Sequence, residues 1–170
     1  MYKQIFLKRG KEESLKRFHP WIFSGAIHHM DEGIEEGETV RVITAAGEFI
    51  GVGHYQIGSI AVRVLSFEDI EINTDFWCER LQSALDVRIG VGIADSPTNN
   101  TYRLVHGEGD YLPGLVIDCY GSTAVMQAHS VGMHVCRNEI CQALVQVMGD
   151  RIANVYYKSE TTLPLSLIHI

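Results

Sequence analysis

Hydrophobic and polar residues follow two different rhythms along the chain, and the change lies near residue 73. Before that point, short β-branched runs are separated by polar and glycine-containing stretches, which is typical of strands. We expect strands at residues 2–7, 39–43, 48–54 and 60–65. Short strands at this spacing predict a small, mostly antiparallel β-barrel of about 70 residues.

Beyond residue 73, apolar residues recur at helical spacing as well as in strand-like runs. Asn73 is suited to cap a helix that ends near Gly90. A second helix is predicted from about residue 131 to 148, with an apolar face of Met133, Cys136, Ile140, Ala143, Leu144 and Val147. We expect strands at residues 102–105, 115–118, 123–128 and 152–157. The last strand has little sequence after it to pair with, so this second unit is predicted to be an incomplete α+β domain.

Length and composition limit the function that the chain can carry. With 170 residues, 46% hydrophobic and 21% charged, it is neither a disordered tail nor a disulfide miniprotein. We expect two small domains and no room for a complete cofactor domain of typical size. The four cysteines lack metal-site spacing and are expected to be buried thiols, so no metal site is predicted. No signal peptide or membrane span is visible, and we therefore expect a soluble, cytoplasmic protein without a membrane partner.

The formal charge of −7 conceals a strong asymmetry. Residues 1–30 carry six basic side chains and two acidic ones, whereas residues 31–75 carry ten acids and two arginines. A local basic patch attracts phosphate whatever the total charge of the protein. The alternative is that the basic residues form an ordinary solvated surface.

The segment from residue 8 to 25 mixes cations with aromatic residues. Basic side chains can neutralise phosphates, and aromatic rings can stack on unpaired bases. Phe18, Trp21 and Phe23 could equally fill the barrel core, and we favour the core for these aromatics. The candidate RNA contacts are Arg9, Lys11, Lys16, Arg17, His19 and Trp21.

A second motif lies between residues 102 and 118. Its acids, Glu108, Asp110 and Asp118, could offer oxygen ligands to a metal or an acid–base pair. Its glycines and the Pro113-Gly114 pair are also typical of turns between two strands, and we favour this structural interpretation. His54, at a strand end, could line a groove, but a packed or solvated position is favoured. No catalytic residue is assigned.

Two strings together carry a family resemblance: HPWIFSGAI at residues 19–27 and HGEGDYLPGL at residues 106–115. Stretches 11–27, 102–121 and 130–163 resemble the large-subunit ribosomal RNA methyltransferase I family. The resemblance implies an N-terminal PUA-type β-barrel that binds RNA, followed by a central α+β domain. It also implies transfer of methyl from S-adenosylmethionine to cytosine C5 of ribosomal RNA, and a full-length form that could be a homodimer.

In that family a Rossmann-like domain binds the methyl donor and supplies a nucleophilic cysteine. Nothing in this sequence matches that domain, so we expect neither a cofactor site nor activity in this chain alone. The expected organisation is a PUA-like RNA-binding domain at residues 1–72 and an incomplete central domain at residues 73–164. Residues 165–170 resemble a translated sequencing adapter and are expected to be a non-native tail. The alternative function is a stand-alone RNA-binding or ribosome-associated module without catalysis.

Overall fold

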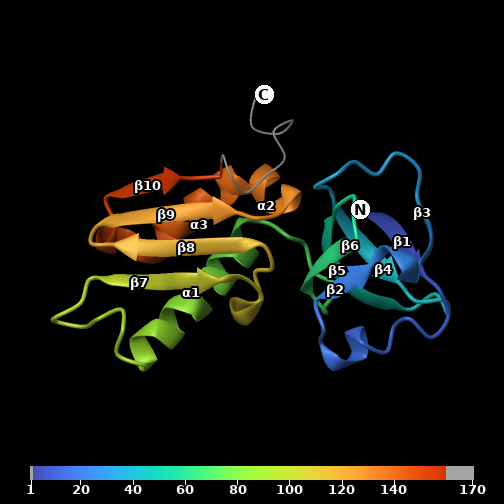
Figure 1. The fold of residues 1–170 in the computed structure, drawn as a ribbon, viewed down its shortest axis with the longest axis horizontal. Helices are drawn as coiled ribbons and strands as arrows, with labels where there is room; N and C mark the ends of the chain where they lie inside the picture. Colours follow the sequence, from blue (N-terminus) through green and yellow to red (C-terminus); the bar gives the residue numbers. More distant parts are fainter. Residues whose placement is uncertain (1, 160–170) are drawn as a thin grey trace. The chain divides into compact units, whose positions relative to one another are not determined.

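The computed structural model describes residues 2–159, which divide into two compact units. Among these residues, unit 1 comprises residues 2–71 and unit 2 comprises residues 72–159 (Figure 1). The tail expected at residues 165–170 lies outside the described residues. Within the described part of the chain, no helix combines the length and apolar character that crossing a membrane requires.

Unit 1 is a six-stranded sheet that curls around a hydrophobic core (Figure 1). Its strands are β1 (Lys3–Leu7), β2 (Trp21–Phe23), β3 (Ile27–Met30), β4 (Thr39–Ile43), β5 (Phe49–Tyr55) and β6 (Ile60–Ser66). Two short 3-10 helices, η1 (Leu15–Arg17) and η2 (Ser24–Ala26), flank β2. The strand order is β2-β6-β5-β4-β1-β3, and β1 and β4 form the parallel pair. The predicted PUA-type, mostly antiparallel architecture is confirmed.

The strands β2 and β3 were not predicted, and both lie at the ends of the sheet. Each is short, and β3 has one partly covered residue followed by three exposed ones. Such strands lack the alternation of apolar and polar residues that identifies a half-buried strand in a sequence. Strand β2 lies within the basic and aromatic segment and β3 follows it directly, so the unpredicted strands are the ones that position the candidate interface.

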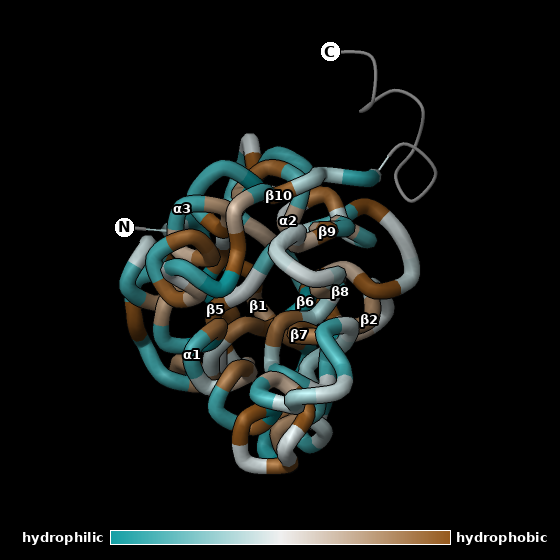
Figure 2. The backbone as a smooth tube through the Cα atoms, turned by 90° about the vertical axis from the view of Figure 1, so that its left-hand side faces the viewer, coloured by the Kyte–Doolittle hydropathy of each residue, from teal (hydrophilic) through white to brown (hydrophobic). Residues whose placement is uncertain are grey.

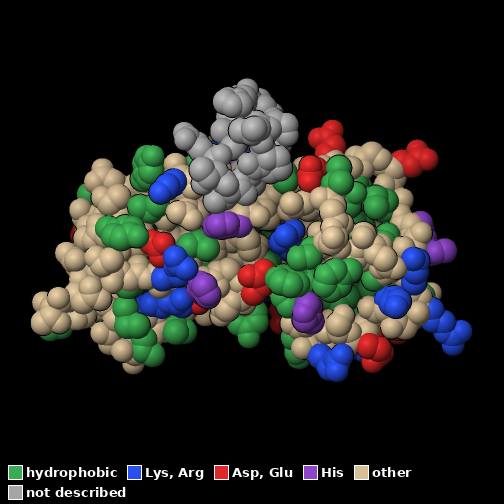
Figure 3. All heavy atoms as spheres, viewed as in Figure 1, with side chains coloured by type: hydrophobic (Ala, Val, Ile, Leu, Met, Phe, Trp, Pro, Cys, Tyr) green, Lys and Arg blue, Asp and Glu red, His purple; other side chains and the backbone are tan. Residues whose placement is uncertain are grey.

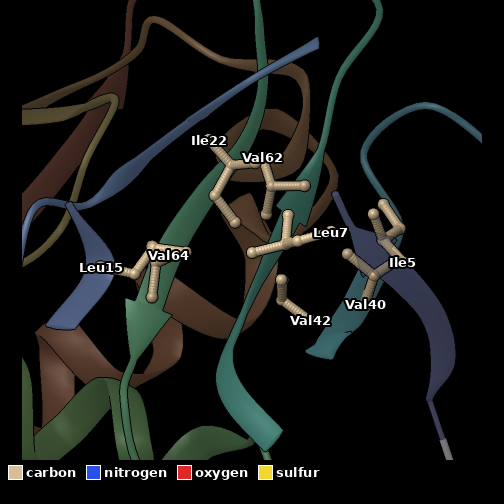
Figure 4. Packing of buried hydrophobic residues seen from close by; sticks show 8 residues of the cluster. All are labelled: Ile5, Leu7, Leu15, Ile22, Val40, Val42, Val62 and Val64. Atoms are coloured by element: carbon tan, nitrogen blue, oxygen red, sulfur yellow. The ribbon is translucent and has the colours of Figure 1, made fainter. Parts of the chain in front are cut away.

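The core of unit 1 is built almost entirely from aliphatic side chains. Eight buried residues form the cluster in Figure 4: Ile5, Leu7, Leu15, Ile22, Val40, Val42, Val62 and Val64. Close packing also fixes Gly53 in β5, because a Cβ atom at this position would lie 2.2 Å from the carbonyl oxygen of Arg63 in β6. Hydrophobic and hydrophilic stretches alternate over short distances along the backbone, as strands with one covered face require (Figure 2).

Unit 2 is a four-stranded sheet with two main helices on one face (Figure 1). Its elements are α1 (Thr74–Gly90), β7 (Thr101–His106), η3 (Gly107–Asp110), β8 (Leu115–Tyr120), β9 (Thr123–Ala128), α2 (Val131–Val135), α3 (Arg137–Met148), η4 (Gly149–Arg151) and β10 (Asn154–Tyr157). The strand order is β10-β9-β8-β7, with β9 and β10 parallel and the other pairs antiparallel. The predicted α+β content is confirmed.

The helix predicted to start at Asn73 forms as expected. The Asn73 side-chain oxygen accepts a hydrogen bond from the Phe76 amide at 3.0 Å, which satisfies a donor of the first turn.

The second predicted helix is interrupted at Cys136, where ψ is 4°, and forms as two helices, α2 and α3. Arg137 Nη1 donates to the His134 carbonyl oxygen at 2.8 Å at this break.

The last strand has a partner, although little sequence follows it. Residues of β10 pair in parallel with β9, from Asn154 opposite Thr123 to Tyr157 opposite Met126. A parallel neighbour requires a crossover connection, and α2 and α3 provide it. The strand before the crossover, rather than sequence after β10, therefore completes the pairing.

Candidate nucleic-acid interface

One buried side chain anchors the segment between β1 and β2 in the core of unit 1, and backbone hydrogen bonds within the segment close a tight turn. Leu15 belongs to the hydrophobic core, while the Phe18 amide donates to the Leu15 carbonyl at 2.8 Å and the His19 amide to the Ser14 carbonyl at 3.1 Å. Phe18 adopts a left-handed conformation with φ of 60°, which is uncommon for a bulky residue. This tight turn leaves Lys16, Arg17, Phe18 and His19 on the surface.

The aromatic residues of this segment are not core residues, which corrects our expectation. Phe18 and Phe23 are 69% and 51% exposed, and Trp21 is half-buried. Side chains alternate across a strand, so burial of Ile22 directs its neighbours Trp21 and Phe23 to the opposite face. Ile22 packs with aliphatic residues that already fill the interior. An exposed aromatic group is more informative about binding than a buried one.

His19, Trp21 and Phe23 form a row of rings, which we call the aromatic row. Ring centroids of His19 and Trp21 lie 5.7 Å apart, those of Trp21 and Phe23 lie 6.5 Å apart, and both pairs are nearly perpendicular. The Trp21 amide donates to His19 Nδ1 at 3.2 Å, so a neutral His19 carries its proton on Nε2. Figure 3 shows hydrophobic side chains gathered over the region of β2, with His and Lys or Arg side chains beside them.

A pocket of about 320 Å³ lies beside this row, and we call it the β2 pocket. It is lined by Lys11, Ser14, Leu15, Trp21, Ile22, Phe23, Gly25 and Ala26. It falls at the lower end of the size range of small-molecule pockets and combines apolar walls with one cation. A single nucleobase is the type of group that such a pocket can accept.

The cations of the segment differ in whether the protein already neutralises them. Lys16 Nζ donates to a Glu13 carboxylate oxygen at 3.0 Å, and this hydrogen bond raises the pKa of Lys16. Arg9, Lys11 and Arg17 are exposed and have no ion pair or side-chain hydrogen bond within residues 2–159. A surface cation without an internal partner retains its full capacity to contact a phosphate.

The structure brings only some of the predicted contacts together, and Lys16 and Arg17 line neither of the two pockets of this region. Lys11 and Trp21 line the β2 pocket, and His19 contacts Trp21, whereas Arg9 lines a different pocket with His28 and His29. Sequence reasoning did not assign Phe18, Phe23, His28 and His29 to the interface. Phe23 lies two residues after Trp21, so alternation along a strand would have revealed it if β2 had been recognised.

The acidic motif of unit 2 is structural, as favoured from the sequence. Asp110 forms a two-point ion pair with Arg88, in which Arg88 Nη2 lies 2.8 Å from Asp110 Oδ2, and it also accepts from the His106 amide. Asp118 pairs with Arg103 at 2.7 and 3.0 Å. In residues 2–159, no group of three or more His, Cys, Asp or Glu side chains could hold a metal.

The turn expected at Pro113-Gly114 forms, and His54 has the packed position that was favoured from the sequence. Gly114 has φ of 88° and the Leu115 amide donates to the Leu112 carbonyl at 3.0 Å, which confirms a turn of type II at Pro113-Gly114. His54 is 2% exposed, so it is packed and does not line a groove.

The thiols in unit 2 are poor candidates for nucleophiles. Burial raises the pKa of Cys78 and of Cys119, and burial together with Glu139 raises the pKa of Cys136 to about 11. A thiolate is the reactive form, and a raised pKa keeps the thiol protonated near neutral pH. These environments suit structural cysteines, although the expectation of full burial holds for Cys119 and not for the partly exposed others.

Comparison with known proteins gives this geometry a family context. A family of PUA-like domains matches residues 5–67. Ribosomal RNA large subunit methyltransferase I of Vibrio parahaemolyticus is 39% identical over 164 residues, which cover 96% of this chain and 40% of the relative. The protein of the same name from Klebsiella pneumoniae is 34% identical over 165 residues, with the same coverage.

A solved structure shows the same fold. A Streptococcus mutans protein described as a SAM-dependent methyltransferase has a TM-score of 0.79 at 22% identity, over 92% of this chain and 40% of that one. A second structure, of a methyltransferase complexed with SAH, has a TM-score of 0.78 with the same coverage. The chain thus spans about 40% of the length of the curated relatives that it matches. Over that span, the ribosomal RNA large subunit methyltransferase I proteins of these organisms are its homologues.

Proposed function

We propose that this chain is the RNA-recognition portion of a cytoplasmic, S-adenosylmethionine-dependent methyltransferase that acts on cytosine C5 of large-subunit ribosomal RNA. The observation that carries the proposal is the exposed aromatic row beside cations that have no internal partner. Neither feature contributes to the aliphatic core of unit 1. Aromatic rings next to unpaired cations are the usual means of binding single-stranded RNA.

Each element of the site has a distinct role in this proposal. Lys11 and Arg17 contact phosphates, Lys16 contributes when it exchanges Glu13 for a phosphate, and Arg9 extends the basic surface. Trp21 and Phe23 stack on bases, and Nε2 of His19 donates to a base or to the sugar–phosphate backbone. Lys11 reaches the same β2 pocket as Trp21, so a base and its phosphate can be bound together.

The described residues do not form a site that fits S-adenosylmethionine. Such sites begin with a glycine-rich loop between a strand and a helix. Here β9 is followed by His129 and then by Ser130, which caps the five-residue α2 through its side chain, without any glycine between β9 and α2. We propose that methyl-donor binding and catalysis depend on the part of the relatives' length that this chain does not match.

The RNA-binding role is tested by replacing Arg9, Lys11, Lys16 and Arg17 together with glutamine. The probe is a fragment of large-subunit ribosomal RNA, and binding is measured by fluorescence anisotropy near physiological salt. We expect the affinity to fall by more than about 10-fold, because the phosphate contacts supply much of the binding energy. The matched control is Lys158→Gln, which removes an exposed cation of unit 2. Equal affinity of the two variants would refute the proposed interface.

The proposed reaction is tested in the organism that encodes the gene. Deleting the gene should remove 5-methylcytidine from one position of large-subunit ribosomal RNA, as read by mass spectrometry of RNase fragments. An unchanged 5-methylcytidine content would contradict the proposed reaction. The RNA-binding proposal would still stand on the affinity measurements, because those measurements do not depend on the reaction.

A further inference from the structure

A second pocket of unit 1 lies where the end of β1, strand β3 and the β4–β5 turn meet. Its volume is about 500 Å³, and it is lined in part by Phe6, Arg9, His28 and His29. We call it the histidine pocket. Its size is within the range of pockets that hold small ligands or single nucleotides. Nothing in the contacts of the aromatic row requires this second site.

The histidine pocket contains a flat aromatic surface. Phe6 and His29 face each other across β1 and β3, with ring centroids 4.2 Å apart and ring planes only 9° apart. His28 approaches the edge of His29, with centroids 5.1 Å apart and planes at 81°. Both histidines are exposed. Stacked, solvent-accessible rings are a platform on which a base can stack.

The histidine pocket is lined by cations, although much of the sequence around it is acidic. It is lined by two cations, Lys8 and Arg9, and by two histidines, but by no acidic side chain. Yet the surrounding sequence is strongly acidic, with ten acids in residues 31–75. Lys8 Nζ donates to the Gly25 carbonyl at 2.9 Å, whereas Arg9 has no internal partner in the described part of the chain. The free guanidinium therefore remains available for a phosphate.

The pocket is also preorganised. The side chain of Thr44 is buried and accepts hydrogen bonds from the amides of Ala46 and Glu48 at 3.3 and 3.2 Å, which fixes the β4–β5 turn. On the other side, the Lys8 amide donates to the Ala26 carbonyl at 2.8 Å. Binding to a pre-formed pocket avoids the entropic cost of ordering its walls.

We propose that the histidine pocket is a second RNA subsite, which binds one unpaired nucleotide by stacking on an outer face of the Phe6–His29 ring pair and by an Arg9–phosphate contact. This inference rests on the proposed RNA-binding function. The inference goes beyond the proposed function because it assigns Arg9 to a separate pocket rather than to the β2 pocket. The partner is a single strand, since a base must be unpaired for its flat face to reach the rings.

One RNA strand can occupy both pockets. Arg9 lines the histidine pocket and Lys11 lines the β2 pocket, and two residues span at most about 7 Å of extended chain. The Lys8–Gly25 and Lys8–Ala26 hydrogen bonds tie the same segment to the wall of the β2 pocket. The two subsites therefore act on neighbouring parts of one ligand, and the second contact gains from the high local concentration that the first creates.

The experiment compares single-stranded RNA oligonucleotides of increasing length, from 3 to about 12 nucleotides, on the whole chain. The test variant is Arg9→Gln with His29→Ala, and the matched variant for the β2 pocket is Lys11→Gln with Phe23→Ala. All four side chains are exposed, and hydrogen exchange checks that unit 1 stays folded. Photo-crosslinking with 4-thiouridine RNA, followed by mass spectrometry, locates the contacted peptides.

For the wild-type chain, we expect affinity to rise with length and crosslinks to appear in both the 6–9 and the 21–25 peptides. The Arg9→Gln/His29→Ala variant should lose at least 5-fold in affinity for the longest RNA, lose the crosslink in the 6–9 peptide, and bind the shortest RNA as before. If this variant binds RNAs of every length normally while the Lys11→Gln/Phe23→Ala variant is impaired, the second subsite is refuted and the proposed function stands. If neither variant affects binding, both proposals fail.

Discussion

The two units differ in how completely they pair their cations. In unit 1, Arg41 pairs with Asp69 and Arg63 donates to Gln56, but other cations are left without a partner among the described residues. In unit 2, every arginine of residues 72–159 has an internal contact: Arg88 with Asp110, Arg103 with Asp118, Arg151 with Asp95, Arg137 with the His134 carbonyl, and Arg80 over the rings of Phe76 and Tyr111. In unit 1, Arg9, Lys11 and Arg17 have no such partner within the described residues, although acids are abundant nearby in the sequence. Cations without an internal partner are available to a ligand, and this is why we propose unit 1, rather than unit 2, as the unit that binds RNA.

The largest effect that would test this comparison is expected at Arg88. Its side chain and that of Asp110 are only 13% and 7% exposed, so the substitution Arg88→Ala leaves a carboxylate buried without its cation. We expect unit 2 to lose about 3–5 kcal/mol of stability, the usual cost of breaking a buried pair. Hydrogen exchange of the β7 and β8 amides measures this loss of stability. Arg17→Ala is the control and should leave the exchange of both units unchanged; a comparable loss there would remove the distinction between the units.

The second effect concerns His54, a buried histidine of unit 1 that its surroundings keep neutral. Burial and the charge of Arg63 lower the pKa of His54 to about 4. The unfolded chain takes up this proton near pH 6.5, so between pH 6.5 and 4 it binds more protons than the folded chain. Stability is therefore complete above pH 6.5 and falls with decreasing pH, by at most about 1.4 kcal/mol per pH unit.

Hydrogen exchange of the β5 amides at several pH values measures this loss. His54→Asn supplies the reference, because asparagine does not titrate. The wild-type curve should fall more steeply than the variant curve between pH 6.5 and 4. Parallel curves would show that His54 is not held neutral by its surroundings.

The third effect separates binding from packing at Phe23. This ring is 51% exposed, so Phe23→Ala should weaken RNA binding by about 1–3 kcal/mol, the range for one stacked base, with little change in thermal stability. Ile22→Ala is the matched control because Ile22 is buried in the core, and it should mainly lower the melting temperature. If Phe23→Ala destabilises unit 1 as strongly as Ile22→Ala, the ring is part of the core after all.

Much of the fold could be predicted because its elements have strong local signals. The central strands β4, β5 and β6 are β-branched and bounded by turns, and Asn73 is an effective N-cap, so these elements lie close to their predicted bounds. The edge strands β2 and β3 could not be recognised, because each is short and only Ile22 among their residues is buried, which leaves no run of alternating apolar and polar positions.

The candidate site was predictable in composition but not in arrangement. The basic residues of the segment were visible, yet the exposure of Phe23 depends on which face of β2 meets the aliphatic core. For Phe23, that choice is made by the long-range pairing of β2 with β6, in which Ile22 lies opposite Val62; Phe18 lies outside β2, in the left-handed turn that ends η1. The break at Cys136 likewise depends on tertiary contacts, because the apolar spacing continues through it.

The salt dependence of RNA binding tests the central claim most directly. The logarithm of the binding constant is measured against the logarithm of salt concentration for the wild-type chain and for the variant with Arg9, Lys11, Lys16 and Arg17 replaced by glutamine. For single-stranded RNA the slope should become shallower by about 0.7 for each phosphate contact removed. We predict a clearly shallower slope for this variant and an unchanged slope for Lys158→Gln. An identical slope for the quadruple variant and the wild type would contradict the assignment of these cations to RNA.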